Sequence, residues 1–124
     1  MLKIAHVNFR IPAGGEPEAE KFWCGLMGFE KLAKPVGNVH PGLWFSHGSY
    51  EVHVSPDVDF EPVTRAHTAF VVEGITEQFQ ALRDYGVKVT VSKGTEEDVM
   101  ACFVNDPFGN RLEMISPLET SMGG

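Results

Sequence analysis

Four side chains that could bind a metal ion fall into two matched pairs along the sequence. His6 is followed 47 residues later by His53, and His67 is followed 46 residues later by Glu113. Imidazole nitrogens and a carboxylate oxygen suit Fe(II), Zn(II) and similar divalent ions. A metal held in this way can polarise a bound oxygen or stabilise an enolate as a Lewis acid. The spacing therefore predicts a divalent metal site with these four residues as ligands.

Each of these residues also has an ordinary structural explanation. A histidine on a strand more often packs or forms a hydrogen bond than binds a metal, and it is the matching of four positions that favours a site. Glu51 shares a strand face with His53 and is an alternative fourth ligand. His40 and His47 have no matching position in the other pair, so we expect both to be structural.

The matched pairs arise because the chain contains an internal repeat. Residues 5–9 and 66–70 both read Ala-His-x-x-Phe. Further segments correspond in the same order: 20–22 with 77–79, 27–29 with 85–87, Phe45 with Phe103, and 52–54 with 112–114. Correspondences in a constant order are typical of a duplicated structural unit. We therefore expect one domain of two modules at residues 3–56 and 66–117, with a linker at 57–65 and a tail at 118–124.

Local signals in the first module predict one strand, one helix and three more strands. Residues 4–11 alternate between apolar and polar side chains, as a strand does. Pro17 fits the first turn of a helix, and Phe22, Leu26 and Met27 would form its apolar face. Gly28 would end that helix, and strands are expected near 30–33, 43–46 and 50–55, the last two joined by a Gly-Ser turn at 48–49.

The second module repeats this order. A strand is expected at 67–72, followed by a helix with Thr76 as its N-cap, an apolar face of Phe79, Leu82 and Tyr85, and an end at Gly86. Strands are expected near 88–92, 101–104 and 111–116, with a type I turn at Asp-Pro-Phe-Gly 106–109. The prediction is an α+β fold of two tandem β-α-β-β-β modules, forming a curved, mostly antiparallel sheet around a cavity.

Three other polar residues share strand faces with the predicted ligands. Asn8 and Arg10 follow His6 on the first strand and are expected to contact the substrate. Arg10 could orient an anionic group, although a solvated arginine is the alternative explanation. Arg111 shares a face with Glu113 and is expected to support that carboxylate.

Composition excludes several classes of partner. The chain has 124 residues, a net charge of −7 and a pI near 5.1. It lacks the clustered Lys and Arg that phosphate binding needs, so we expect no nucleic-acid partner. Its apolar runs are too short to span a bilayer, and residues 1–6 lack the apolar run of a signal peptide, so a cytoplasmic protein without a membrane partner is expected. Cys24 and Cys102 are expected to be reduced, structural thiols.

The motifs resemble those of the vicinal oxygen chelate superfamily, which includes glyoxalase I, fosfomycin-resistance thiol transferases, extradiol dioxygenases, methylmalonyl-CoA epimerase and bleomycin-resistance proteins. The resemblance rests on Ala-His-x-x-Phe at His6, Phe-Trp-x-x-Leu-Met-Gly-Phe at 22–29, His67, and Asn-Asp-Pro-Phe-Gly-Asn-Arg-Leu-Glu at 105–113. It covers residues 3 to 117, and the Asp-Pro-x-Gly-x-x-x-Glu stretch is its most specific part.

The resemblance implies paired modules and one divalent metal ion per site, namely Fe, Zn, Ni or Mn, with no organic cofactor. His6, His67 and Glu113 match the three commonest ligand positions of the family, and Glu113 is expected to act in catalysis as well. His53 stands where glyoxalase I has a glutamate that also serves as a base, which argues against the lactoylglutathione reaction. Bleomycin-resistance proteins bind their drug without a catalytic metal, and the retained ligand residues argue against that function here.

The resemblance also implies a partner and a reaction class. We expect a homodimer in which each site takes His6 and His53 from one chain and His67 and Glu113 from the other. The expected substrate is a small oxygen-rich molecule, and the expected reaction is that of a lyase, an isomerase or a dioxygenase. The alternative is a non-catalytic protein that binds a small molecule.

Overall fold

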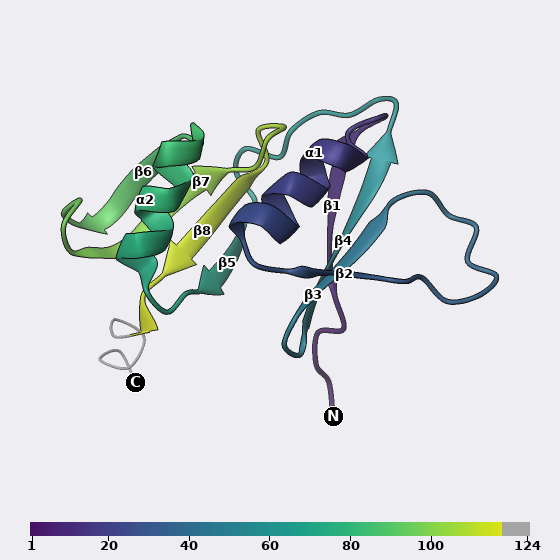
Figure 1. The fold of residues 1–124 in the computed structure, drawn as a ribbon, viewed down its shortest axis with the longest axis horizontal. Helices are drawn as coiled ribbons and strands as arrows, with labels where there is room; N and C mark the ends of the chain where they lie inside the picture. The colour runs from purple at the N-terminus through teal and green to yellow at the C-terminus, as the bar shows by residue number, and fades with distance from the viewer. Residues whose placement is uncertain (118–124) are drawn as a thin grey trace. The chain divides into compact units, whose positions relative to one another are not determined.

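The chain folds as two α+β units, each with its own sheet. Unit 1 spans Met1–Pro62 and unit 2 spans Val63–Gly124. The computed structural model describes residues 1–117, so the predicted tail at 118–124 lies outside the described residues. Each unit carries its helical segment between its first and second strands (Figure 1). The predicted α+β arrangement of two β-α-β-β-β modules is confirmed.

Unit 1 contains a four-stranded sheet and one interrupted helix. Its elements are β1 (Val7–Pro12), α1 (Glu16–Glu20), the π-helix η1 (Lys21–Leu26), β2 (Glu30–Leu32), β3 (Leu43–His47) and β4 (Tyr50–Asp57). The strand order is β1-β4-β3-β2. β1 runs parallel to β4, and the other two pairings are antiparallel.

Unit 2 repeats that topology. Its elements are β5 (Thr68–Val71), α2 (Ile75–Tyr85), β6 (Val89–Gly94), β7 (Val99–Asn105) and β8 (Arg111–Ile115). The strand order is β5-β8-β7-β6, with β5 parallel to β8 and the other pairings antiparallel. The predicted duplication and the mostly antiparallel pairing are therefore present in both units.

The first strand of unit 1 begins later than predicted. Phe9 and Ile11 are buried while Asn8 and Arg10 are exposed, so the predicted alternation holds within β1. The strand starts at Val7, which pairs with Val52, and not at residue 4. In that register residue 4 would lie opposite the turn that joins β3 to β4. Ala5 and His6 would lie opposite Tyr50 and Glu51 of β4 but do not pair with them.

The helix of unit 1 buries a different face from the one predicted. Phe22 and Trp23 are each 1% exposed, whereas Leu26 and Met27 are only half-buried. The backbone N–H of Met27 donates to the carbonyl of Phe22 five residues earlier, as in a π-helix. This wider turn places consecutive residues closer together on one side. Both aromatic rings can then face the sheet.

The helix of unit 2 also starts and ends differently from the prediction. Gly74, with φ of 69°, precedes the helix, so Thr76 is not the N-cap. The buried face is Ile75, Phe79 and Leu82, and Tyr85 at the last turn is 56% exposed. Gly86 adopts a left-handed φ of 97° directly after the helix, which confirms the predicted end. No helix in the described part of the chain is long and apolar enough to cross a membrane.

The turn between β7 and β8 is held by a buried aspartate. Asp106 Oδ1 accepts hydrogen bonds from the backbone N–H groups of Phe108 and Asn110, at 2.9 and 2.8 Å. Asp106 Oδ2 accepts a third from the Asn110 amide at 2.8 Å. The backbone N–H of Gly109 donates to the Asp106 carbonyl, which closes the predicted turn. These bonds set the entry of β8, the strand that carries Glu113.

Replacing Asp106 by alanine should lower the free energy of unfolding by about 2–3 kcal/mol, because three donors lose a buried acceptor. Urea unfolding measures this difference in the free energy of unfolding.

Burial raises the pKa of Asp106 despite the hydrogen bonds that lower it. The folded state therefore binds the proton more tightly, and the stability that Asp106 contributes decreases as the pH rises through the raised pKa. Relative to Asp106→Asn, which does not titrate, the wild type should lose stability as the pH rises from the ordinary aspartate pKa through the raised pKa of Asp106. A pH-independent difference would contradict this.

Candidate metal-binding site

Unit 2 brings His67 and Glu113 into direct contact. His67 lies immediately before β5, and Glu113 lies on β8, the parallel neighbour of β5. His67 Nε2 is 3.1 Å from Glu113 Oε1, although 46 residues separate them in the chain. Their side chains are 33% and 21% exposed. The pair is therefore open to a ligand from solvent.

The other nitrogen of His67 is already occupied. His67 Nδ1 lies 2.9 Å from the backbone carbonyl oxygen of Arg65. A carbonyl only accepts hydrogen bonds, so Nδ1 carries the hydrogen and Nε2 of the neutral ring keeps a lone pair. An ionised Glu113 carboxylate also only accepts. Two acceptors face each other, and a proton or a metal cation between them satisfies both.

The separation of these two atoms fits shared coordination. Nitrogen and oxygen ligands lie about 2.1 Å from a zinc-like ion, which places two neighbouring ligands about 3.0–3.4 Å apart. The observed 3.1 Å falls in that range. A hydrogen bond from Nδ1 to a backbone carbonyl is also the usual way in which proteins orient a metal-binding histidine. The donor set of unit 2 therefore fits a divalent ion.

The Phe103 ring contacts both His67 and Arg111. Phe103 on β7 lies opposite Glu113, and the His67 ring meets it edge-on, with ring centroids 5.2 Å apart. The Arg111 guanidinium lies over the same Phe103 ring, 3.8 Å from its centroid. Within residues 1–117 Arg111 forms no ion pair with Glu113. The prediction that Arg111 supports that carboxylate is therefore wrong, because Phe103 draws the guanidinium onto its own face.

Unit 1 places its pair at the equivalent position. Asn8, two residues after His6, lies opposite His53 in the pairing of β1 with β4. Ala69, two residues after His67, lies opposite Glu113 in the pairing of β5 with β8. The duplicated sequence therefore produces the same register twice.

The contact within the first pair is a stack of rings. The His6 and His53 ring centroids are 3.9 Å apart with 13° between the planes. Trp44 stacks on His53 as well, at 4.2 Å and 5°. β4 lies between β1 and β3, so His53 is the middle ring of the three. His53 is only 7% exposed.

Stacking on His53 and binding a metal ion together with His53 require different orientations of the His6 ring. The lone pairs of an imidazole lie in the plane of its ring, so two parallel rings do not direct them to one point. To share an ion with His53, the His6 ring has to rotate out of the stack. His6 precedes β1 and is exposed, so no strand pairing restrains its backbone. Glu51 remains an alternative, since its Oε1 lies 3.0 Å from His53 Nε2.

The two predicted substrate-contacting residues are tied to β4. Asn8 Nδ2 donates to Ser55 Oγ at 2.8 Å, and Arg10 Nη1 donates to Asp57 Oδ2 at 2.8 Å. Both lie on the face of β1 that adjoins His53. The Arg10 side chain remains 63% exposed in this ion pair.

Sequence comparison of the repeats missed Trp44. It matched Phe45 with Phe103, but the register pairs Trp44 with His53 and Phe103 with Glu113. Trp44 is thus the structural equivalent of Phe103, and the predicted match is wrong by one residue. Phe45 is fully buried, and strand alternation places Trp44 and Phe45 on opposite faces of β3. Within residues 1–117 no three or more His, Cys, Asp or Glu side chains lie close enough together to hold a metal ion.

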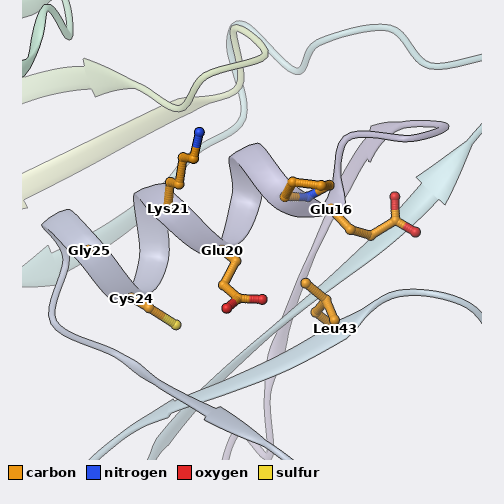
Figure 2. A pocket seen from close by; sticks show the side chains of 7 residues that line it. Glu16, Glu20, Lys21, Cys24, Gly25 and Leu43 are labelled. Carbon is orange, nitrogen blue, oxygen red and sulfur yellow. The ribbon is translucent and has the colours of Figure 1, made fainter.

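A surface pocket of about 530 Å³ lies elsewhere in unit 1 and contains none of the predicted site residues. Figure 2 shows Glu20 and Cys24 pointing from the helix toward the side on which Leu43 lies, while Lys21 points away. Burial and the nearby Glu20 raise the pKa of the Cys24 thiol. Burial and Glu113 raise that of Cys102 to about 11. Both free cysteines are therefore protonated at neutral pH, which supports the structural interpretation.

The comparisons with known proteins agree with this architecture. Residues 3–114 match the family model described as the Glyoxalase/Bleomycin resistance protein/Dioxygenase superfamily. A glyoxalase family protein from Bacillus anthracis is 35% identical over 94% of this chain and 95% of its own, with a TM-score of 0.82. No curated protein sequence matches the chain significantly.

Two more distant structures share the fold. A fosfomycin resistance protein, FosX, from Listeria monocytogenes, complexed with Mn(II) and 1S,2S-dihydroxypropylphosphonic acid, is 11% identical with a TM-score of 0.78 over 100% of this chain and 99% of its own. TnmS3, an antibiotic binding protein from Streptomyces sp. CB03234, is 20% identical with a TM-score of 0.68 over 94% and 98%. Together with the family match and the duplicated β-α-β-β-β topology, they lead to one conclusion: the chain belongs to the Glyoxalase/Bleomycin resistance protein/Dioxygenase superfamily.

Proposed function

We propose that this protein is a metal-dependent enzyme that acts on a small oxygen-rich molecule, as a lyase, an isomerase or a dioxygenase. The ligands in this proposal are His67 and Glu113 together with His6 and His53, and the ion is Fe, Zn, Ni or Mn. The observation that carries the proposal is the 3.1 Å approach of His67 Nε2 to Glu113 Oε1 while Nδ1 is held by a backbone carbonyl. The Mn(II) in the FosX structure supports it by analogy of fold.

Each residue has a stated task in this proposal. A bound divalent ion would polarise two neighbouring oxygens of the substrate. The Arg65 carbonyl keeps His67 in the tautomer that leaves Nε2 free. Glu113 presents its second oxygen, Oε2, as the proton acceptor for the substrate. Asn8 and Arg10, fixed by Ser55 and Asp57, contact the remainder of the substrate.

Gently purified protein without a His-tag should contain about one divalent ion per chain, measured by elemental analysis. His53→Ala should weaken binding of that ion but leave a site of three ligands. If Glu51 is the ligand instead, Glu51→Ala will cause the larger loss in a metal titration. Wild-type affinity in both variants would limit the protein ligands to three.

The alternative function is non-catalytic binding of a small molecule. The stack of Trp44, His53 and His6 favours it, because its end ring, His6, is exposed and a planar ligand can stack on such a ring. TnmS3, an antibiotic binding protein, shares the fold. Metal-dependent turnover of any oxygen-rich substrate would distinguish the enzyme from the binding protein.

We further propose a homodimer whose sites each take His6 and His53 from one chain and His67 and Glu113 from the other. In a mixed dimer of a His6→Ala chain and a Glu113→Ala chain, both changes then fall in one site and the second site is intact. About half of the wild-type metal should remain. If each site is built within one chain, both sites are damaged and little metal will remain. A monomer in solution would contradict the shared site without affecting the ligand assignment.

A further inference from the structure

Arg111 lies beside the metal-ligand pair of unit 2 without a role in holding it. It stands two residues before Glu113 on β8, so both side chains leave the same face of the strand. At about 3.3 Å per residue, their backbone positions are about 7 Å apart. Phe103 lies opposite Glu113 and carries the guanidinium of Arg111 on its ring. Arg111 is half-buried, so solvent still reaches it.

The charge of Arg111 is not neutralised by a neighbour within residues 1–117, where the ion pairs of the chain leave it out. Arg10, by contrast, is paired with Asp57. Arg83 stacks on Phe79 much as Arg111 stacks on Phe103, but it also pairs with Glu96 at 3.2 Å. The chain as a whole carries a charge of −7, so Arg111 is not part of a generally basic surface.

A guanidinium stacked on an aromatic ring keeps its N–H groups available, because these point outward in the guanidinium plane. The planar fork of donors matches the two oxygens of a carboxylate or the oxygens of a phosphonate or phosphate. Stacking also reduces the conformational freedom that the side chain must lose on binding such a group. Phe103 thus holds Arg111 ready for an anion.

We propose that Arg111 binds an anionic group of the substrate, so that the substrate is a small molecule carrying two chelating oxygens and, within reach of the Arg111 guanidinium, a carboxylate, phosphonate or phosphate. This rests on the proposed metal site, since the chelating oxygens bind there. The proposed role of Arg111 restricts the expected oxygen-rich substrates to those that carry a negative charge. Arg111 acts here as the group that selects the substrate, separate from the metal ligands.

The test uses two hydroxamates that chelate a metal through the same two oxygens. Succinic monohydroxamate ends in a carboxylate, and its isostere with a terminal amide is neutral. Calorimetric titration of the Zn(II)-loaded protein should give roughly tenfold or greater preference for the acid, as expected for charge-assisted hydrogen bonds. Arg111→Gln should abolish that preference while leaving Zn(II) affinity and amide binding unchanged.

Arg83→Gln is the matched control, because it removes another ring-stacked arginine of unit 2 and should keep the preference. Arg111→Lys should retain only part of it, since lysine lacks the planar fork. Equal binding of acid and amide to the wild type, or an undiminished preference in Arg111→Gln, would overturn the proposal for Arg111 alone. Failure of the wild type to bind Zn(II) would overturn the proposed metal site, and this inference with it.

Discussion

Replacing His67 by alanine should reduce metal affinity by more than about a hundredfold. Loss of a residue that only orients a metal ligand already lowers metal affinity about ten- to a hundredfold, and His67 is proposed to bind the metal directly. Glu113→Ala should do the same, since the contact of His67 Nε2 with Glu113 Oε1 is the best-fitting part of the donor set. Glu113→Gln should be nearly as damaging, because the amide removes the negative charge. Isothermal titration with Zn(II) or Mn(II) measures all three.

Two controls separate loss of a ligand from loss of structure. His40→Ala removes an exposed loop histidine, and Glu97→Ala removes an exposed carboxylate of unit 2. Both should bind metal like the wild type. Circular dichroism should show that His67→Ala remains folded, since His67 lies outside the core. Full metal occupancy in folded His67→Ala would disprove the assignment of His67 as a ligand.

Replacing Trp23 by alanine should destabilise unit 1 by about 3–5 kcal/mol, the usual cost of removing a buried aromatic ring. Trp23 is 1% exposed. Its ring centroid lies 5.4 Å from that of Phe9 and 5.2 Å from those of Phe22 and Phe29. The loss is a large share of the roughly 5–15 kcal/mol that stabilises a typical domain.

Urea unfolding followed by circular dichroism measures this effect without relying on the fluorescence of the deleted residue. Tyr85→Ala is the control, because Tyr85 is a large aromatic residue at a helix end but is 56% exposed. Its effect should stay within about 0.5 kcal/mol, as for most surface changes. Similar losses for Trp23→Ala and Tyr85→Ala would contradict the importance of the aromatic cluster.

The order of elements could be predicted from the sequence because its signals are local. Alternation at Phe9 and Ile11, and the glycines at 28 and 86, each report on a few neighbouring residues. The predicted element bounds and buried faces are wrong where contacts between distant parts of the chain determine the structure. β1 pairs with β4 only from Val7 onward, and Trp23 enters the core because the π-helix turns it toward the sheet.

The duplication and the four candidate ligands could be recognised without coordinates, because repeated residue types and spacings are visible in the amino-acid sequence. The contacts of those side chains, by contrast, became visible only in the folded chain. His67 and Glu113 meet through the pairing of β5 with β8, whereas His6 and His53 stack because an imidazole faces an imidazole. Arg111 turns to Phe103 rather than Glu113 because the register of β7 with β8 places a ring beside it. Such contacts depend on strand register, and one residue of shift exchanges the two faces of a strand.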